Sequence, residues 1–221
     1  MLGSLIETID VTVPVSGTKG KPFGLVGRLA LPAPPTGVVI VARGSGSSRR
    51  SPRNAAVAAA LHESWIGTLQ LDLLTEDEAA RGGSVFDIAL LAERLLAAVR
   101  FVSTLDHTRH LPLGLVGAST AAAAALVAAA CDPAVKAVVS RGGRPDLAGR
   151  RLRAVRIPTL LIVGGDDTEV LALNRQALTE IEGVENELVV VPGATHRFEE
   201  PDALAEVTRL AAEWFTDHLH A

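Results

Sequence analysis

The amino-acid sequence predicts an α/β fold with a mostly parallel, doubly wound sheet of about eight strands, the first ones antiparallel, and helices on both faces. Three observations predict it. Two opening segments mix apolar and polar residues in partial alternation, short apolar runs follow them, and segments of helical character separate those runs. The order strand, helix, strand, helix after an antiparallel start is typical of such a sheet, because parallel strands need crossover helices.

The hydrophobic pattern places the elements. Residues 6–13 and 25–31 are expected to form a hairpin of half-buried strands at the sheet edge. Short apolar runs predict buried parallel strands at residues 38–42, 68–73, 113–116, 135–139, 159–163 and 188–191. Longer segments predict helices at residues 52–64, 86–102, 120–131, 170–181 and 201–220. Apolar residues recur every three or four positions along 86–102, so charged residues such as Arg94 are expected off its buried face.

Length and composition narrow the class of protein. With 221 residues, 48% of them hydrophobic, the chain is expected to fold as one domain over residues 1–221. A net charge of −4 provides no field that would attract a polyanion, so nucleic acid and acidic membrane surfaces are poor candidate partners. A small-molecule partner is expected, and no cofactor is indicated.

Cysteine content and hydropathy bear on location. The single cysteine, Cys131, excludes an internal disulfide and a multi-cysteine zinc site, which fits a reducing cytoplasm. It is expected to be a buried structural thiol. Residues 1–13 carry Glu7 and Asp10 and do not read as a signal peptide. The most apolar stretch, residues 118–131, is too short to cross a bilayer, so no membrane association is predicted.

The most informative stretch is LGLVGASTA, residues 113–121, in which a strand runs directly into an Ala-rich helix. A nucleophile elbow needs this arrangement, with the serine on a strained turn and small residues two positions before and after it. Gly117 and Ala121 flank Ser119 in this way, although glycine is commoner at the second position. The alternative is that Ser119 simply caps the following helix.

Two later motifs supply candidate partners for Ser119. Asp166 and Asp167 follow the strand predicted at 159–163, and His196 follows the last strand in the sequence PGATHRF. The acidic residues could instead be turn residues, and His196 could be a surface histidine. The other five histidines fall on helices or before the strand that carries the elbow, which makes them poor candidates for a base. No metal-ligand spacing such as H-E-x-x-H occurs, so no metal site is predicted.

With these motifs the chain resembles the α/β-hydrolase superfamily and, within it, the dienelactone-hydrolase-like group of small enzymes without a large cap. The resemblance covers nearly the whole chain. It implies a catalytic triad of Ser119, Asp167 and His196, since the G-x-x-D-x-x-V pattern of residues 164–170 selects Asp167 over Asp166. It also implies an oxyanion hole made by the backbone N–H groups of Ser45 and Thr120.

The glycine-rich loop after the first buried strand, ARGSGSS, departs from the His-Gly with which relatives usually begin it, because Arg43 stands there. The same loop could cradle a phosphate. The third glycine of a dinucleotide fingerprint and the Gly-Lys-Ser/Thr of a P-loop are both missing, so nucleotide binding ranks below hydrolysis.

Arginines stand on the segments expected around the nucleophile, and Arg43, Arg50, Arg141 and Arg144 are candidate substrate-binding residues. Guanidinium groups pair well with carboxylate or phosphate, so the substrate could be anionic. The alternative is a solvated loop face with local acidic partners such as Asp146.

The predicted function is a serine hydrolase that cleaves small or soluble carboxylic esters, lactones or thioesters through an acyl-enzyme. Only residues 141–156 separate two consecutive strands where many relatives insert a lid, so an open site is expected. The alternative is a catalytically silent protein of this fold that serves as a binding or accessory module.

Overall fold

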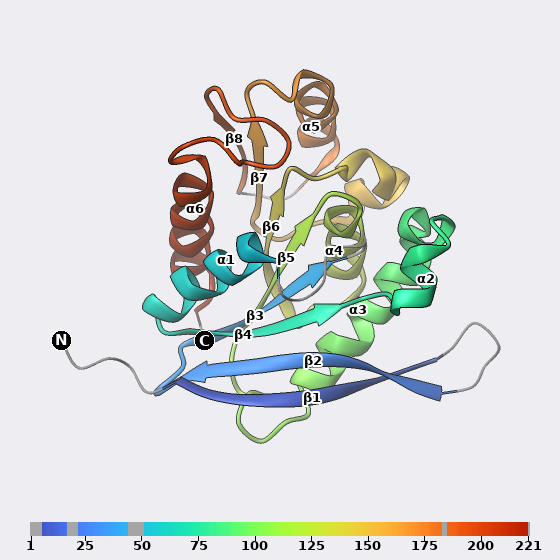
Figure 1. Ribbon diagram of the computed structural model, residues 1–221, viewed down its shortest axis with the longest axis vertical. Helices are drawn as coiled ribbons and strands as arrows, with labels where there is room; N and C mark the ends of the chain where they lie inside the picture. The colour runs from blue at the N-terminus through green and yellow to red at the C-terminus, as the bar shows by residue number, and fades with distance from the viewer. Residues whose placement is uncertain (1–5, 17–21, 44–50, 183–184, 221) are drawn as a thin grey trace.

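A computed structural model describes residues 6–16, 22–43, 51–182 and 185–220 of the chain (Figure 1). An eight-stranded sheet runs through it in the order β1-β2-β4-β3-β5-β6-β7-β8. The strands are β1 (Ile6–Ser16), β2 (Pro22–Pro32), β3 (Gly37–Arg43), β4 (Ile66–Asp72), β5 (Leu113–Ala118), β6 (Val135–Arg141), β7 (Thr159–Gly164) and β8 (Asn186–Val191).

The pairing confirms the predicted sheet. β1 pairs antiparallel with β2, and β2 pairs antiparallel with β4, whereas every pair from β4 through β3 to β8 is parallel. Several strands begin earlier than expected, among them β4, which was expected at 68–73. It begins at Ile66 because the buried residues Ile66 and Gly67 already pair with Gly37 and Val38 of β3.

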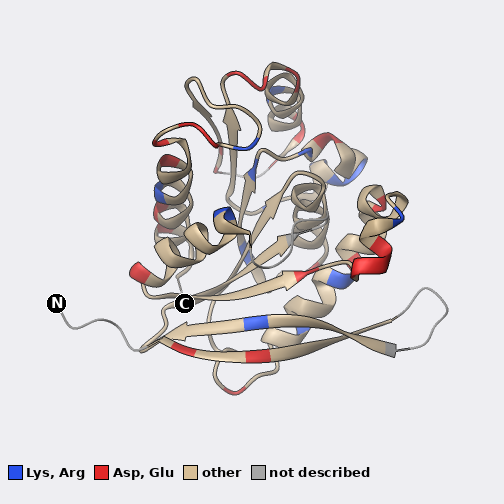
Figure 2. Ribbon diagram, viewed as in Figure 1, with Lys and Arg blue, Asp and Glu red and all other residues tan. Residues whose placement is uncertain are grey.

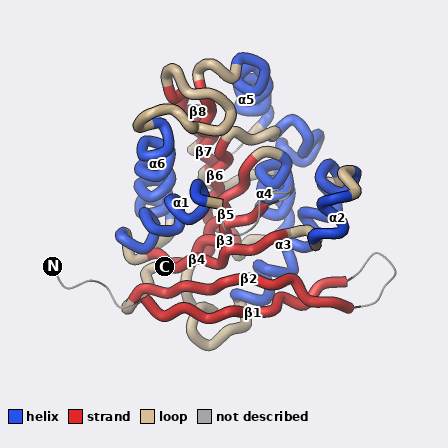
Figure 3. Tube along the Cα trace, in the orientation of Figure 1, coloured by secondary structure: helices blue, strands red, loops and turns tan. Residues whose placement is uncertain are grey.

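The helices cover both faces of the sheet, as the pattern predicts (Figure 3). They are α1 (Pro52–Glu63), α2 (Glu76–Ala80), α3 (Ile88–Val102), α4 (Thr120–Cys131), α5 (Thr168–Glu180) and α6 (Ala203–His218), with 3₁₀ segments η1 (Gly83–Phe86) and η2 (Pro145–Ala154). The short elements α2, η1 and η2 were not predicted. Within the described residues, no helix combines the length and apolar composition that a membrane span requires.

Two hydrophobic clusters hold the helices to the sheet. One joins α3, α4 and η2 to the strands, and the other joins α1 and α6 to the opposite face. α4 packs closely because Ala121 to Ala125 are all fully buried. Its last residue, Cys131, is exposed, so the expectation of a buried thiol is wrong. The Arg151 guanidinium donates a hydrogen bond to its Sγ over 3.1 Å.

Arg94 corrects a second expectation, because only 1% of it is exposed. Its guanidinium donates to both carboxylate oxygens of Glu78 over 2.7 Å and to the Leu73 carbonyl over 2.7 Å. Glu78 belongs to α2, whose acidic residues colour this short helix red beside α3 in Figure 2. The pair fastens the connection after β4 to α3, and its hydrogen bonds lower the pKa of Glu78 from 4.5 to about 2.

Removing this buried cation should destabilise the fold. We expect Arg94→Met to lower the free energy of unfolding by about 3 kcal/mol, because the Glu78 carboxylate is left without its partner. Denaturant titration at neutral pH measures the loss. The matched control is Arg209→Met, since Arg209 pairs with Glu206 and Glu213 on an exposed helix face, where solvent screens such pairs and they add little stability.

The same comparison has a defined pH dependence. Because the pKa of Glu78 is lowered in the folded state, the stabilisation is present above its ordinary value of 4.5 and is lost as the pH falls toward 2. The stability difference between the wild type and Arg94→Met should therefore shrink over that interval. A difference that stays constant across it would contradict this role of Glu78.

Candidate active site

Ser119 occupies the turn between β5 and α4 with φ 52° and ψ −125°, a conformation that non-glycine residues rarely adopt. A Cβ atom on Gly117 would lie 2.5 Å from the Ala121 carbonyl oxygen and from the Ala122 Cα, so only glycine fits there. The turn is therefore held tight by the contact between strand and helix. The Ser119 side chain accepts no capping hydrogen bond from α4, which argues against a role as a helix cap.

Asp167 and His196 meet at the same edge of the sheet. Asp167 stands between β7 and α5, and His196 lies on the segment after β8. His196 Nδ1 and Asp167 Oδ2 are 2.7 Å apart, and the Asp167 side chain caps no helix. A neutral imidazole that donates from Nδ1 to this carboxylate presents its Nε2 lone pair as a proton acceptor. Asp166 is exposed, and only its backbone N–H engages this segment, through the Ala194 carbonyl.

Glycines allow the His196 segment to approach the sheet. A Cβ on Gly164 would lie 2.2 Å from the Ala194 carbonyl oxygen. A Cβ on Gly142, whose φ is 49°, would lie 3.0 Å from the His196 carbonyl oxygen. Phe198, only 1% exposed, anchors the segment in the core. These close contacts explain why glycines end β7 and follow β6.

The turn after β6 borders Ser119 as well. The Arg144 backbone N–H donates to the Ser119 carbonyl oxygen over 3.1 Å, and the Gly142 N–H donates to the Ile162 carbonyl of β7. Ser119 and His196 thus share a neighbour in residues 142–144. In the described part of the chain no hydrogen bond joins their side chains directly.

Of the two candidate oxyanion donors, the structure describes only Thr120. Thr120 is the first residue of α4 and is buried directly after the nucleophile candidate. Ser45 lies outside the described residues.

The four candidate substrate-binding arginines also differ. Arg50 and the side chain of Arg43 lie outside the described part. Arg144 forms a two-pronged salt bridge with Asp146, with both bonds at 2.8 Å, and this contact raises the pKa of Arg144 above its usual value.

Arg141 is buried, with 8% exposed, at the end of β6. It pairs in register with Ala118, the residue before Ser119, and its Nη2 donates to Asn54 Oδ1 over 3.2 Å. Asn54 lies in the first turn of α1, and the neighbouring Arg53 forms a salt bridge with Glu199 near His196. Sequence reasoning missed Asn54. Nothing in the sequence around it indicates a contact with Arg141 of β6, which lies 87 residues further along the chain.

Other titratable groups lie elsewhere. His62 bonds Thr68 Oγ1, and burial lowers the pKa of its imidazole. His218 bonds Glu185 and the Trp214 carbonyl. Among the residues with described positions, no three His, Cys, Asp or Glu side chains are grouped as metal ligands.

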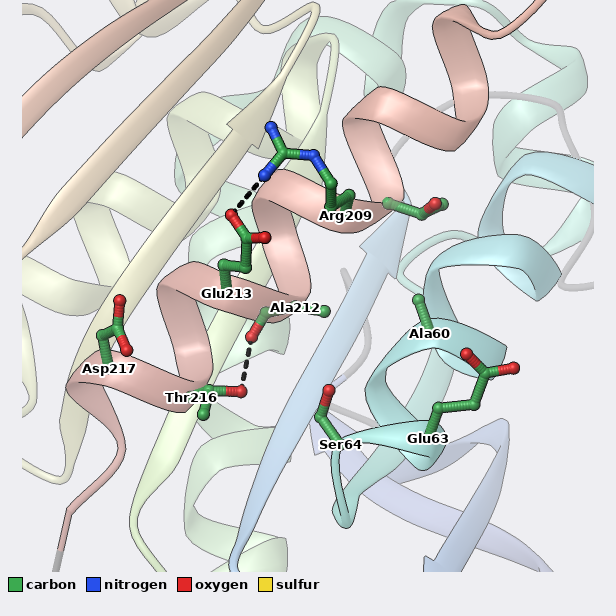
Figure 4. Close-up of a pocket in the computed structure, with 9 residues that line it drawn as sticks. Ala60, Glu63, Ser64, Arg209, Ala212, Glu213, Thr216 and Asp217 are labelled. Carbon is green, nitrogen blue, oxygen red and sulfur yellow. Dashed lines mark hydrogen bonds and ion pairs between the residues drawn. The ribbon is translucent and has the colours of Figure 1, made fainter. Parts of the chain in front are cut away.

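A groove of about 420 Å³ opens between α1 and α6 (Figure 4). Small residues such as Ala60, Ser64 and Ala212 line it, and acidic side chains stand at its rim. Among the described residues that line it, the one cation is Arg209, which is bound to Glu206 and Glu213. The groove contains neither Ser119 nor the Asp167 and His196 pair, so it is separate from the candidate active site.

The sheet order, the strained serine after β5, the acid after β7 and the histidine after β8 define the α/β-hydrolase class. Comparison with known proteins agrees. The model of the dienelactone hydrolase family matches residues 78–219. The chain belongs to the dienelactone hydrolase family.

Solved structures share this fold. The chain is similar to a dienelactone hydrolase from Anabaena variabilis, with 47% identity, a TM-score of 0.90, and coverage of 97% of this chain and 99% of that one. Est1E from Butyrivibrio proteoclasticus has a TM-score of 0.77 at 17% identity, covering 94% and 98% of the two chains. A cold-adapted esterase from an Arctic intertidal metagenomic library reaches 0.73 at 18% identity, covering 99% and 96%.

Curated relatives carry a different name. Two Mycobacterium tuberculosis proteins, from strains CDC 1551 / Oshkosh and ATCC 25618 / H37Rv, are each named "Putative phosphoribosyl transferase" and are 54% identical to the chain over 200 residues. That match covers 90% of this chain and 45% of each relative. The chain therefore spans less than half the length of these relatives.

The close contact at Gly117 can be tested directly. We expect Gly117→Ala to lower the free energy of unfolding by about 2–3 kcal/mol, because the added methyl group would collide with backbone atoms of α4. Thermal or denaturant unfolding measures the effect. Gly83→Ala is the matched control, since a Cβ there meets nothing within 4 Å. Equal stabilities of the two variants would show that β5 and α4 are not packed as described.

Proposed function

We propose that the chain is a serine hydrolase that cleaves small or soluble carboxylic esters, lactones or thioesters through an acyl-enzyme on Ser119. The observation that carries the proposal is the position of Ser119. Its backbone is strained, its side chain makes no capping hydrogen bond to α4, and it lies at the edge of the sheet where His196 and Asp167 are hydrogen-bonded. Membership of the dienelactone hydrolase family supports the same chemistry.

In the proposed cycle, His196 Nε2 takes the proton from the Ser119 hydroxyl as the oxygen attacks the substrate carbonyl. The Asp167 carboxylate holds the imidazole in the required tautomer and stabilises the imidazolium. Protonated His196 then gives its proton to the leaving alcohol or thiol. Water, deprotonated by His196, hydrolyses the acyl-enzyme and restores Ser119.

The tetrahedral intermediates carry a negative oxygen that needs donors. We assign this role to the backbone N–H groups of Thr120 and Ser45. The first N–H of a helix has no partner within the helix, so the start of α4 supports the assignment for Thr120. One such donor is worth about 3 kcal/mol of barrier.

The connection between β6 and β7 supports small or soluble substrates. It consists of residues 142–158 and contains the single short element η2. The described residues therefore include no helical cap at this position, where many enzymes of this class carry one. An exposed Cys131 suits a reducing compartment, and we propose the cytoplasm as the location.

The nucleophile and the base can be tested together. We expect Ser119→Ala and His196→Ala each to reduce kcat for p-nitrophenyl butyrate by at least about 10³-fold, because both act on one proton transfer. A fluorophosphonate probe should label the wild type and leave Ser119→Ala unlabelled. Initial rates and gel fluorescence measure the two effects.

The control is His110→Ala, which removes an exposed histidine of the segment before β5 and should retain activity. Hydrolysis that persists in Ser119→Ala at the wild-type rate would overturn the proposal. Wild-type protein that neither hydrolyses any ester, lactone or thioester nor reacts with the probe would favour the accessory module instead.

The substrate class can be narrowed. We propose that the substrate carries an anionic group and that Arg141 contributes to its recognition. The position of Arg141 supports this, since this buried residue lies at the end of β6 and its Cα pairs in register with Ala118, the residue before Ser119. Arg144, which forms a salt bridge with Asp146, is the second candidate.

A pair of esters of similar length tests the charge preference. We expect Arg141→Met to raise KM for p-nitrophenyl hemisuccinate about tenfold and to change KM for p-nitrophenyl butyrate little, since only the first carries a carboxylate. Steady-state kinetics measures both values. Arg109→Met, on the segment before β5, serves as control. An equal rise for both esters would remove the charge preference and leave Arg141 a structural role.

The name of the M. tuberculosis relatives suggests a second activity. The matched segment takes up 45% of each relative, and in this chain that segment folds as a hydrolase domain. We propose that the transferase activity which the name denotes belongs to the remaining part of those proteins. Transfer of a phosphoribosyl group by this chain alone would contradict this division.

A further inference from the structure

Asn174 is a buried polar residue that the proposed reaction does not use. It lies in the middle of α5 and is 0% exposed. Its side-chain amide nitrogen donates to the Val170 carbonyl over 2.8 Å, one turn earlier in the helix. It also donates to the Gly143 carbonyl over 3.0 Å, which lies in the turn after β6. Both amide hydrogens are thus used, and one of them joins two separate elements.

The turn that receives this hydrogen bond touches two candidate catalytic residues. Its Arg144 N–H donates to the Ser119 carbonyl oxygen, and its Gly142 lies against the His196 backbone. The third candidate, Asp167, directly precedes α5, the helix that carries Asn174. Residues 142–144 and α5 together border all three.

The turn has little freedom on its other side. A Cβ on Gly143 would lie 2.0 Å from Ser140 Oγ and 2.5 Å from the Ala122 Cβ, so the turn rests directly on β6 and α4. Packing therefore sets how close the turn lies to α4. The rotation of the peptide plane between Gly143 and Arg144 is held by hydrogen bonds at both of its ends. Asn174 donates to its carbonyl, and its N–H donates to the Ser119 carbonyl.

The geometry points to Asn174 as a positioning residue for the reaction proposed above. By holding the Gly143 carbonyl, Asn174 fixes the peptide that follows it, whose N–H belongs to Arg144 and donates to Ser119. It thereby holds the backbone of Ser119 and the segment of His196 in a fixed position relative to α5 and Asp167. This inference rests on the proposed function, because positioning matters only if the three residues act together.

Two substitutions separate the contact from the packing. Asn174→Leu keeps the side-chain volume and removes both donated hydrogen bonds. Asn174→Ser can still bond the carbonyl four residues earlier, as serine often does in helices, but is too short to reach Gly143. Because Asn174 Oδ1 is buried with no hydrogen-bond partner among the described residues, the change to leucine removes no accepted hydrogen bond beyond the two donated ones.

We expect both variants to lower kcat for p-nitrophenyl butyrate by about tenfold with little change in KM, since small misplacements of reacting groups slow the chemical step. The second-order rate of fluorophosphonate labelling at Ser119 should fall by a similar factor, because it reports the reactivity of the serine without a substrate-binding step. Both measurements are made well below the unfolding temperature of each variant.

The matched control is Ile181→Ala, which weakens the packing of the far end of α5 in the core without touching the turn. It should lose stability and keep the wild-type kcat and labelling rate. If Asn174→Leu and Asn174→Ser keep the wild-type values, Asn174 is not a positioning residue. If Ile181→Ala falls as far as they do, the effect is one of general stability and the inference also fails.

The failure of the proposed function looks different. In that case Ser119→Ala retains hydrolysis, whatever the Asn174 variants do. Loss of activity in Ser119→Ala together with full activity in both Asn174 variants would overturn only the positioning role.

Discussion

The close contact between β5 and α4 is the constraint on which the rest of the site depends. Gly117 lies so near the carbonyl of Ala121 that the chain must reverse within a single turn, and Ser119 takes a left-handed conformation as a result. Such strain persists only where the surroundings hold it. Here β5 is hydrogen-bonded on both sides, to β3 and β6, and the alanines of α4 let the helix press onto the sheet. The alanine content of this helix is thus part of the site.

Polar side-chain contacts connect the other candidate groups at the same edge of the sheet. Asp167 holds His196, Asn174 holds the turn after β6, and Arg141 holds Asn54 in the first turn of α1. Each of these hydrogen bonds joins two separate elements, and each involves a residue at or just after the carboxyl end of a parallel strand. An edge of this kind suits catalysis because the strands fix the positions of loops that are otherwise independent.

The sequence predicted the parallel strands well because their residues are buried on both faces, which gives short apolar runs such as residues 159–163. β4 was misplaced because Gly67 interrupts the apolar run although it is paired and buried. Arg94 was misassigned for another reason. Helical periodicity considers one helix at a time, whereas the partner of Arg94 is Glu78 in α2, a five-residue helix that depends on its cap and its tertiary contacts.

In the candidate site, too, residues in local sequence motifs were predicted, whereas a residue defined by a tertiary contact was not. Ser119, Asp167 and His196 each sit in a local motif, and the structure joins Asp167 rather than Asp166 to the histidine. Asn174 has no motif, because its hydrogen bond spans 31 residues and one asparagine in a helix carries no signal of its own. Gly143 could have been noticed, since two adjacent glycines after a buried strand indicate a tight approach of backbone.

The fold by itself does not select the substrate. A TM-score of 0.77 at 17% identity shows that the same sheet supports distant sequences, so the sheet itself cannot select the ester. Selectivity must come from the connections at its carboxyl edge. In the described residues these connections include the segment fastened by Arg94 and Glu78, the turn before η2, and the segment of His196. The segment after β4 is anchored by the buried pair of Arg94 and Glu78, and the turn before η2 by the buried Asn174 amide, so buried polar side chains fix two of these connections.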